Sequence, residues 1–255
     1  MLLWINGPFG GGETQTAYEL HRRLPGSVVC DPEHAGFGLH RMMPATLRGD
    51  FQDLPAWRQG VYEVLDLVLR RHQGTVIAPM TLVDAGYFEE IIGRLRENGH
   101  EVGHFALLAE RETVLRRLTE RGWGSGLKRE SFAVARPGPV RWIFAGPGRL
   151  APHLAALSES AKYVQYEADP PPCDARHQTP RADPRRSAAQ ALDHCLEALA
   201  DARFAEHIRT DRLTVPQVAE TVAASAGLSL EPNTYGRYRH RLRRIRVGLS
   251  HIRFD

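Results

Sequence analysis

The sequence is almost without lysine. Lys128 and Lys162 are the only lysines among its 33 basic side chains, so arginine carries nearly all of the positive charge. Such arginine usage arises either from a GC-rich genome or from phosphate recognition, to which the planar guanidinium is well suited. Both explanations stay open at this point, because the net charge of the whole chain is only +3.

Cysteine is also scarce, and long apolar runs are missing. The three cysteines, Cys30, Cys173 and Cys195, lie far apart without a C-x-x-C pair, which argues against a disulfide framework and against a zinc site. The apolar runs all fall short of the roughly 18 residues that indicate a membrane span. The first residues predict a short strand and no secretion signal, so we expect a cytoplasmic protein.

What the sequence does contain is an alternation of strand and helix patterns over 255 residues, 42% of them hydrophobic. Apolar runs predict strands at 2–6, 27–31, 75–80, 102–109 and 205–211. Apolar residues at helical spacing predict helices at 14–24, 57–71, 87–98, 112–121, 187–200 and 215–226. Strands that alternate with helices predict an α/β fold around a parallel sheet.

The amino-acid composition changes in the middle of the sequence and again at its end. Residues 123–186 are rich in glycine and proline, which predicts an insertion into a core formed by 1–122 and 187–230. Residues 231–255 are predicted to form a basic amphipathic C-terminal helix, with an apolar stripe among many arginines. Such a helix either lies on an anionic membrane surface or docks on the protein's own sheet or on a second subunit, as in a homodimer.

The stretch "WINGPFGGGETQT" has the layout of a phosphate-binding loop, Gly7-x-x-x-x-Gly12-x-Thr14, between the first strand and the first helix. Backbone N–H groups in such a loop bind phosphate oxygens, and the helix N-terminus adds a favourable potential for anions. The backbone freedom comes from Gly7, Gly10, Gly11 and Gly12. We therefore expect ATP or another nucleoside triphosphate to bind these glycines together with Glu13, Thr14 and Gln15, with Mg²⁺ on the Thr14 hydroxyl.

Several segments together resemble the tunicamycin-resistance protein family of P-loop proteins, over residues 1 to about 122 and 187 to about 230. They are "WINGPFGGGETQTAYELHRRL", "DPEHAGFGL", "DFQDLPAWR", "APMTLVDAGYFEEIIGRLRENG", "FALLAERETVLRRLTERG" and "HIRTDRLTVPQVAETVAA". The family is similar to small-molecule kinases of the nucleoside monophosphate kinase type and, more distantly, to chloramphenicol phosphotransferase and shikimate kinase. The resemblance implies a three-layer P-loop NTPase fold, with the insertion in the lid region.

Glu13 departs from the resemblance, because the family has lysine at this position and that lysine bridges the β- and γ-phosphates. Replacing a positive by a negative charge beside the phosphates removes several kcal/mol, since unit charges about 4 Å apart interact by roughly 4 kcal/mol at a surface-like dielectric. Three explanations stay open. ATP use was lost naturally, or arginine side chains or a second metal ion compensate, or an experimenter introduced the substitution.

The resemblance also implies residues on the acceptor side. Asp31 follows the second strand, where an aspartate of such kinases contacts the acceptor hydroxyl and acts as general base. The alternative for Asp31 is a helix cap or turn residue before Pro32. Arg58 and, with less support, Arg41 resemble substrate-binding arginines, and a solvated surface position is the alternative for Arg58.

Lid arginines that reach the transferring phosphate are implied at the end of the predicted helix 112–121. Arg117 and Arg121 are four residues apart and share a helix face, so they are the candidates for catalytic residues, with a solvated helix face as the alternative. If positive charge replaces the missing lysine, this pair supplies it, with Arg129 as an addition.

Two functions stay open. The first is a phosphotransferase acting on a small molecule such as a nucleoside or nucleoside antibiotic, in resistance or in tailoring. The second is a catalytically silent protein that binds a ligand or nucleotide and sequesters the drug. Nucleic-acid binding through the arginine-rich tail is disfavoured, because no platform of base-stacking aromatic residues accompanies it.

Overall fold

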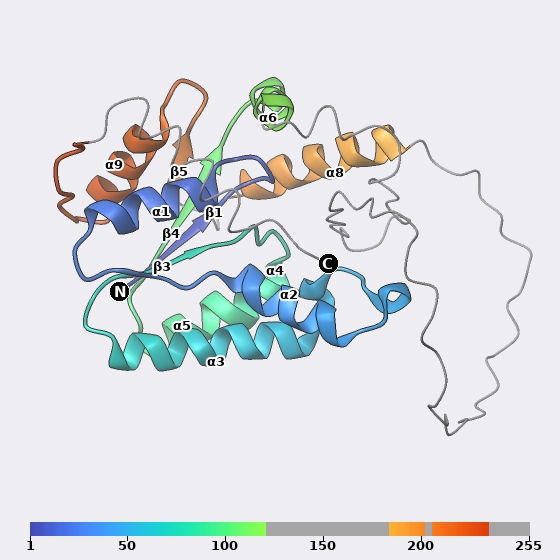
Figure 1. Cartoon of the computed structure of the whole chain (residues 1–255), viewed down its shortest axis with the longest axis horizontal. Helices are drawn as coiled ribbons and strands as arrows, with labels where there is room; N and C mark the ends of the chain where they lie inside the picture. Colours follow the sequence, from blue (N-terminus) through green and yellow to red (C-terminus); the bar gives the residue numbers. More distant parts are fainter. Residues whose placement is uncertain (121–183, 202–205, 235–255) are drawn as a thin grey trace, which may run out of the picture.

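The computed structural model describes residues 1–120, 184–201 and 206–234, and its centre is a parallel sheet of five strands (Figure 1). The strands are β1 (Leu2–Asn6), β2 (Val28–Val29), β3 (Val76–Pro79), β4 (Val102–Leu108) and β5 (Glu206–Arg209). They lie in the order β2-β3-β1-β4-β5, with β1 in the middle. The α/β fold and the parallel sheet predicted from the sequence are thereby confirmed.

Helices cover both faces of the sheet and complete three layers. They are α1 (Glu13–Arg23), α2 (Pro32–Met42), α3 (Pro55–Arg71), α4 (Ala85–Phe88), α5 (Arg94–Glu97), α6 (Arg111–Leu118), α8 (Pro184–Leu199) and α9 (Val215–Ser225). Short turns lie at η1 (Ala45–Leu47) and η2 (Phe51–Asp53), and a π-helical turn, η3 (Glu89–Gly93), joins α4 to α5. Helices α1 and α9 pack on one face, whereas α3, α4 and α5 pack on the other (Figure 1).

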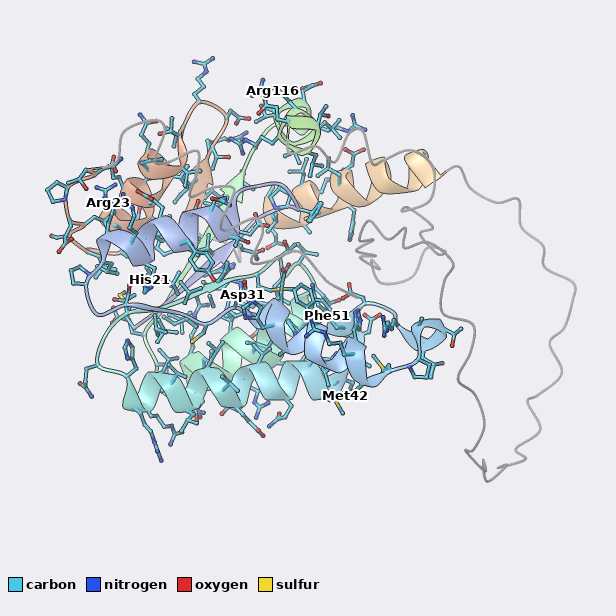
Figure 2. All side chains as sticks on the ribbon, in the orientation of Figure 1. His21, Arg23, Asp31, Met42, Phe51 and Arg116 are labelled. Carbon is cyan, nitrogen blue, oxygen red and sulfur yellow. The ribbon has the colours of Figure 1, made fainter. Side chains whose placement is uncertain are left out.

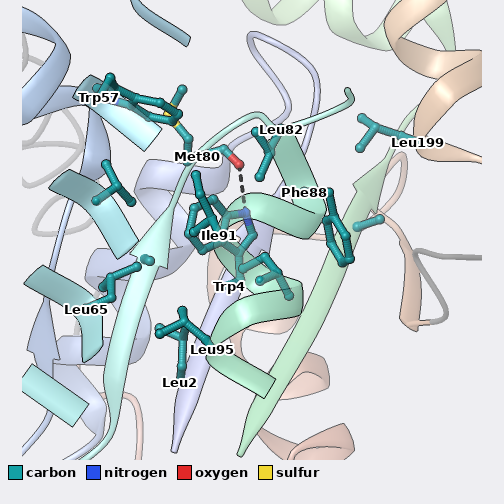
Figure 3. Packing of buried hydrophobic residues seen from close by; sticks show 14 of the residues in the cluster. Leu2, Trp4, Trp57, Leu65, Met80, Leu82, Phe88, Ile91, Leu95 and Leu199 are labelled. Atoms are coloured by element: carbon teal, nitrogen blue, oxygen red, sulfur yellow. Dashed lines mark hydrogen bonds between the residues drawn. The ribbon is translucent and has the colours of Figure 1, made fainter. Parts of the chain in front are cut away.

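The central strand β1 supplies both layers of the core. Leu3 and Ile5 pack toward α1 and α9, whereas Leu2 and Trp4 pack toward α3 and α5 (Figure 3). The indole Nε1 of Trp4 donates a hydrogen bond to the backbone oxygen of Met80 at 3.1 Å, which ties β1 to the residue that follows β3 (Figure 3). This contact holds the segment that follows β3 against β1, at the carboxyl ends of the two strands.

Several local expectations need correction. Helix α2 was not predicted, the strand expected at 27–31 is reduced to Val28–Val29, and the helix expected at 87–98 is interrupted by the π-helical turn. Helix α8 begins at Pro184, three residues before the expected start. Of the insertion predicted at 123–186, residues 123–183 lie outside the described residues, as do residues 121 and 122 before it.

The chain after α9 returns to the end of α1. Glu231 N donates to Arg23 O at 2.8 Å, and the Arg22 guanidinium donates to Asn233 Oδ1 at 2.9 Å. Residues 231–234 of the expected C-terminal helix are not helical, and 235–255 lie outside the described residues. In the described ranges we find no helix long and apolar enough to cross a membrane.

Candidate functional site

The loop between β1 and α1 has the curled backbone that its glycines predicted. Gly10 and Gly12 adopt left-handed conformations, with φ of 89° and 102°, which only glycine adopts without strain. Gly11 N donates to Pro8 O at 2.5 Å and closes a tight turn. A Cβ atom on Gly10 would also lie 2.9 Å from Leu118 Cδ2 of α6. The loop therefore depends on glycine for its backbone conformation and for its contact with α6.

The first peptide of the loop is held by two side chains. Asn6 Oδ1 accepts hydrogen bonds from Gly7 N at 2.9 Å and Leu82 N at 3.0 Å, and Asn6 Nδ2 donates to Leu82 O at 2.7 Å. Thr81 Oγ1 donates to Gly7 O at 2.6 Å. Both the N–H and the C=O of Gly7 are therefore fixed against the segment that follows β3. Neither Asn6 nor Thr81 was predicted as a site residue, although a polar residue at the end of the apolar strand β1 was a signal for Asn6.

Arg117 of α6 forms hydrogen bonds with the loop and with the residue that follows β5. Its Nη1 donates to Gly11 O at 3.2 Å and to Thr210 Oγ1 at 3.0 Å, and its Nη2 donates to Thr210 O. Thr210 is buried directly after β5, and its hydroxyl donates to Leu108 O at 3.2 Å. The guanidinium that was predicted to reach a phosphate thus lies beside the loop. Arg121 and Arg129 fall outside the described residues.

Glu13 directs its carboxylate back over the loop. The oxygen Oε2 is buried; a Cβ atom built on Gly7 would lie 3.4 Å from it, and one built on Gly11 would lie 3.2 Å from it. Burial, with a smaller contribution from the Glu13 charge, raises the pKa of the Cys195 thiol on α8 to about 12. The carboxylate therefore lies within the curl of the loop, near α8. Thr14 and Gln15 are half-buried in the first turn of α1.

Asp31 lies at the start of α2 (Figure 2), and its Oδ1 accepts a hydrogen bond from Glu33 N at 2.9 Å. This contact caps the helix, which confirms the alternative weighed for Asp31 without testing its role toward an acceptor. Burial, followed by the charge of Asp31, raises the pKa of the half-buried Tyr18 on α1. The Asp31 carboxylate at the start of α2 is therefore close enough to the Tyr18 phenol of α1 to disfavour its ionisation.

The two predicted substrate arginines differ in their surroundings. Arg58 is 8% exposed, so the alternative of a solvated surface residue is wrong. Its Nε donates to Glu90 Oε2 and its Nη1 to Gln52 O, both at 2.6 Å, while its guanidinium lies 4.2 Å from the centre of the Tyr87 ring. Arg41, in contrast, is exposed in the last turn of α2.

Gln52 links these acceptor-side residues to the loop. Its Nε2 donates to Thr81 O at 3.1 Å, and the hydroxyl of Thr81 reaches Gly7 O. Nearby, Tyr87 OH donates to Asp53 Oδ1 at 3.0 Å, and burial together with this contact raises the pKa of Tyr87 to about 12. A continuous set of hydrogen bonds therefore joins the loop to the N-terminal end of α3.

The comparisons with known proteins agree with this geometry. No model of a known protein family matches the sequence, and no curated protein matches it. Among solved structures, the tunicamycin resistance protein of Deinococcus radiodurans is 27% identical, with a TM-score of 0.58 over 91% of this chain and 98% of that protein. The chain resembles a tunicamycin resistance protein over almost its whole length. The resemblance and the α/β P-loop NTPase fold inferred from the sequence are thereby confirmed.

Two kinases show weaker similarity. A sugar kinase from Janibacter sp. HTCC2649 is 17% identical, with a TM-score of 0.46 over 89% of this chain and 95% of that kinase. Shikimate kinase from Bacteroides thetaiotaomicron is 12% identical, with a TM-score of 0.46 over 89% of this chain and 99% of that enzyme. Of these three structures, only the tunicamycin resistance protein has a TM-score above 0.5.

Proposed function

We propose that this chain is a P-loop phosphotransferase for a small hydroxylated molecule, of the nucleoside or nucleoside-antibiotic class. The observation that supports this most is the glycine loop at the N-terminus of α1. Asn6 and Thr81 form hydrogen bonds with the backbone of Gly7, and Arg117 donates to the backbone oxygen of Gly11. A loop of this form binds phosphate through its N–H groups and the helix dipole. The acceptor class follows from the name of the tunicamycin resistance protein that the chain resembles.

The residues of the site divide between the two substrates. Residues 7–12 would hold the phosphates of a nucleoside triphosphate, and Thr14 would hold Mg²⁺, which neutralises phosphate charge when it is bound. Arg117, which donates to Gly11 O beside the loop, would supply a cation that stabilises charge on the transferring group. Asp31 would accept the proton of the acceptor hydroxyl, and Arg58 and Arg41 would lie on the acceptor side.

A second function is supported by Glu13. The loop has the shape for phosphate, but a carboxylate stands where a phosphate-binding lysine is expected, and opposite charges about 4 Å apart would have contributed roughly 4 kcal/mol. The capping contact of Asp31 also gives this residue a structural role. A protein that binds and sequesters its ligand without transfer therefore remains the second candidate.

Calorimetry with MgATP tests the proposal. The Glu13→Lys variant is expected to bind MgATP at least about a hundredfold more tightly than the chain with Glu13, because the loop backbone is the same and only the charge differs. Equal affinities would contradict the proposed nucleotide site.

A thermal-shift series with candidate nucleosides then addresses the acceptor, because a ligand that binds only the folded state raises its melting temperature. We expect a nucleoside or nucleoside antibiotic to stabilise the chain and Arg58→Gln to weaken the effect. The same shift in Arg58→Gln would exclude Arg58 from the acceptor site.

A further inference from the structure

We propose that the Glu13 carboxylate is a built-in anion of the phosphate loop, which occupies the phosphate position and competes with phosphate ligands for it. This inference rests on the proposed phosphate-binding role of the loop and extends it. It assigns to Glu13 an inhibitory contact, which is more than the absence of a lysine.

The position of the carboxylate is the first support. Its Oε2 lies 3.4 Å from a Cβ built on Gly7 and 3.2 Å from one built on Gly11, so it faces both ends of the curl. Oε2 is itself buried, so the carboxylate oxygen that faces the two glycines is shielded from solvent. A glutamate that extended into solvent would approach neither glycine. The side chain therefore turns inward, toward the two glycines that border the loop.

The electrostatic surroundings are the second support. Glu13 is the first residue of α1, where the helix dipole stabilises negative charge. Arg117 brings its guanidinium to Gly11 O, so a cation lies beside the same loop. The pKa of the Cys195 thiol on α8 is raised to about 12, so this thiol is neutral and adds no negative charge that would repel an anion in the loop. These features favour an anion in the loop, and the carboxylate is tethered there.

Glu13 can weaken phosphate binding in two ways: it lacks the positive charge of a lysine, and its carboxylate occupies the phosphate position. If Glu13 only lacks the attraction of a lysine, removing its charge without adding a cation changes little. If its carboxylate occupies the phosphate position, an uncharged side chain opens the loop. Glu13→Gln keeps the length of the side chain and removes the charge, and Glu13→Ala removes both.

The test is calorimetric titration of inorganic tripolyphosphate, at fixed pH and ionic strength and without divalent metal. We expect Glu13→Gln and Glu13→Ala to bind tripolyphosphate at least about tenfold more tightly than the chain with Glu13, because the internal charge no longer competes. Glu110→Gln is the matched control, since it removes an exposed carboxylate at the same edge of the sheet, outside the loop. It should change the affinity by less than about threefold, because solvent and salt screen exposed charges.

Three results would overturn the inference: equal gains in Glu13→Gln and Glu110→Gln, no gain in either Glu13 variant, or no binding by any variant. Circular dichroism confirms that each variant is folded before titration. The outcome is separate from the proposed function. Tighter tripolyphosphate binding by Glu13→Gln with no MgATP binding by Glu13→Lys would support the internal anion and contradict the phosphotransferase.

Discussion

Acidification should destabilise the protein through His104, which lies under the phosphate loop. His104 is on β4, is 4% exposed, and accepts a hydrogen bond at Nε2 from Asn6 Nδ2 at 3.2 Å. Burial, with smaller contributions from the charges of Arg96 and His207, lowers the pKa of His104 from 6.5 to about 3. Protonation at Nε2 would turn this acceptor into a donor that faces a donor, so the contact that orients Asn6 under Gly7 would be lost.

The magnitude follows from proton linkage. Between pH 6.5 and about pH 3 the unfolded chain binds a proton at His104 that the folded chain does not bind. The stabilisation by neutral His104 is therefore complete above the unfolded pKa and is lost as the pH falls. At pH 5 the loss is about 2 kcal/mol, because each pH unit below the unfolded pKa costs about 1.4 kcal/mol.

Urea denaturation at pH 7 and pH 5 measures this loss. The free energy of unfolding should fall about 2 kcal/mol further in the unchanged chain than in His104→Gln, whose amide oxygen can accept the bond from Asn6 and does not titrate. Other titrating groups are common to both proteins and cancel in the difference. An equal loss in the two proteins would show that His104 is not the group that takes up the proton.

Three further predictions concern the loop and the acceptor side. Asp31→Asn should leave stability nearly unchanged in denaturation experiments, whereas Asp31→Ala should cost about 1 kcal/mol, because asparagine also caps helices. In a transfer assay both should lower turnover about 10² to 10⁴-fold, and an unchanged rate in Asp31→Asn would limit Asp31 to capping. Arg117→Gln should weaken MgATP binding to the Glu13→Lys chain by about tenfold or more, since it removes charged hydrogen bonds to Gly11 and Thr210; unchanged calorimetric affinity would contradict this role. Thr81→Val should lower the melting temperature and destabilise the fold by about 1 kcal/mol, and Thr81→Ser should not, because only serine keeps a donor for the loop; equal melting temperatures would show that the hydroxyl is unimportant.

Much of the fold could be predicted because its signals are local. The apolar run of β1 and the helical spacing in α3 follow directly from burial on the sheet. Helix α2 was missed because its two glycines lower helix propensity, and tertiary contact overrides this. Gly36 packs so closely on Phe51 that a Cβ would lie 2.5 Å from its Cγ. The glycine that weakens the pattern is thus the residue that the packing requires.

The site was predictable where it is contiguous in the sequence. The loop from Gly7 to Gly12 has a characteristic glycine spacing. Arg117 was implied by the family resemblance, and α6 brings its guanidinium beside the loop. Thr81 and Thr210 were missed because each is ordinary in its own segment. They come together with the loop only when the carboxyl ends of β3, β1 and β5 align at one edge of the sheet.

The arrangement around Arg58 could not be inferred for a similar reason. Its position at the start of α3 was predicted, but its partners Glu90 and Gln52 belong to other segments. The π-helical turn that carries Glu90 does not follow from apolar spacing, which predicted one continuous helix at 87–98. The direction of the Glu13 side chain was likewise beyond the sequence, because the loop motif fixes the backbone only.

Phosphoryl transfer from ATP labelled at its γ-phosphate shows whether this chain is a phosphotransferase. The assay uses Mg²⁺, a series of nucleosides and nucleoside antibiotics, and three proteins: the unchanged chain, Glu13→Lys, and Glu13→Lys combined with Asp31→Asn. The account predicts labelled product with Glu13→Lys, less with the unchanged chain, and at least about a hundredfold less with the double variant than with Glu13→Lys. If Glu13→Lys binds MgATP but labels no acceptor, the claim of a phosphotransferase is contradicted and the sequestering protein takes its place.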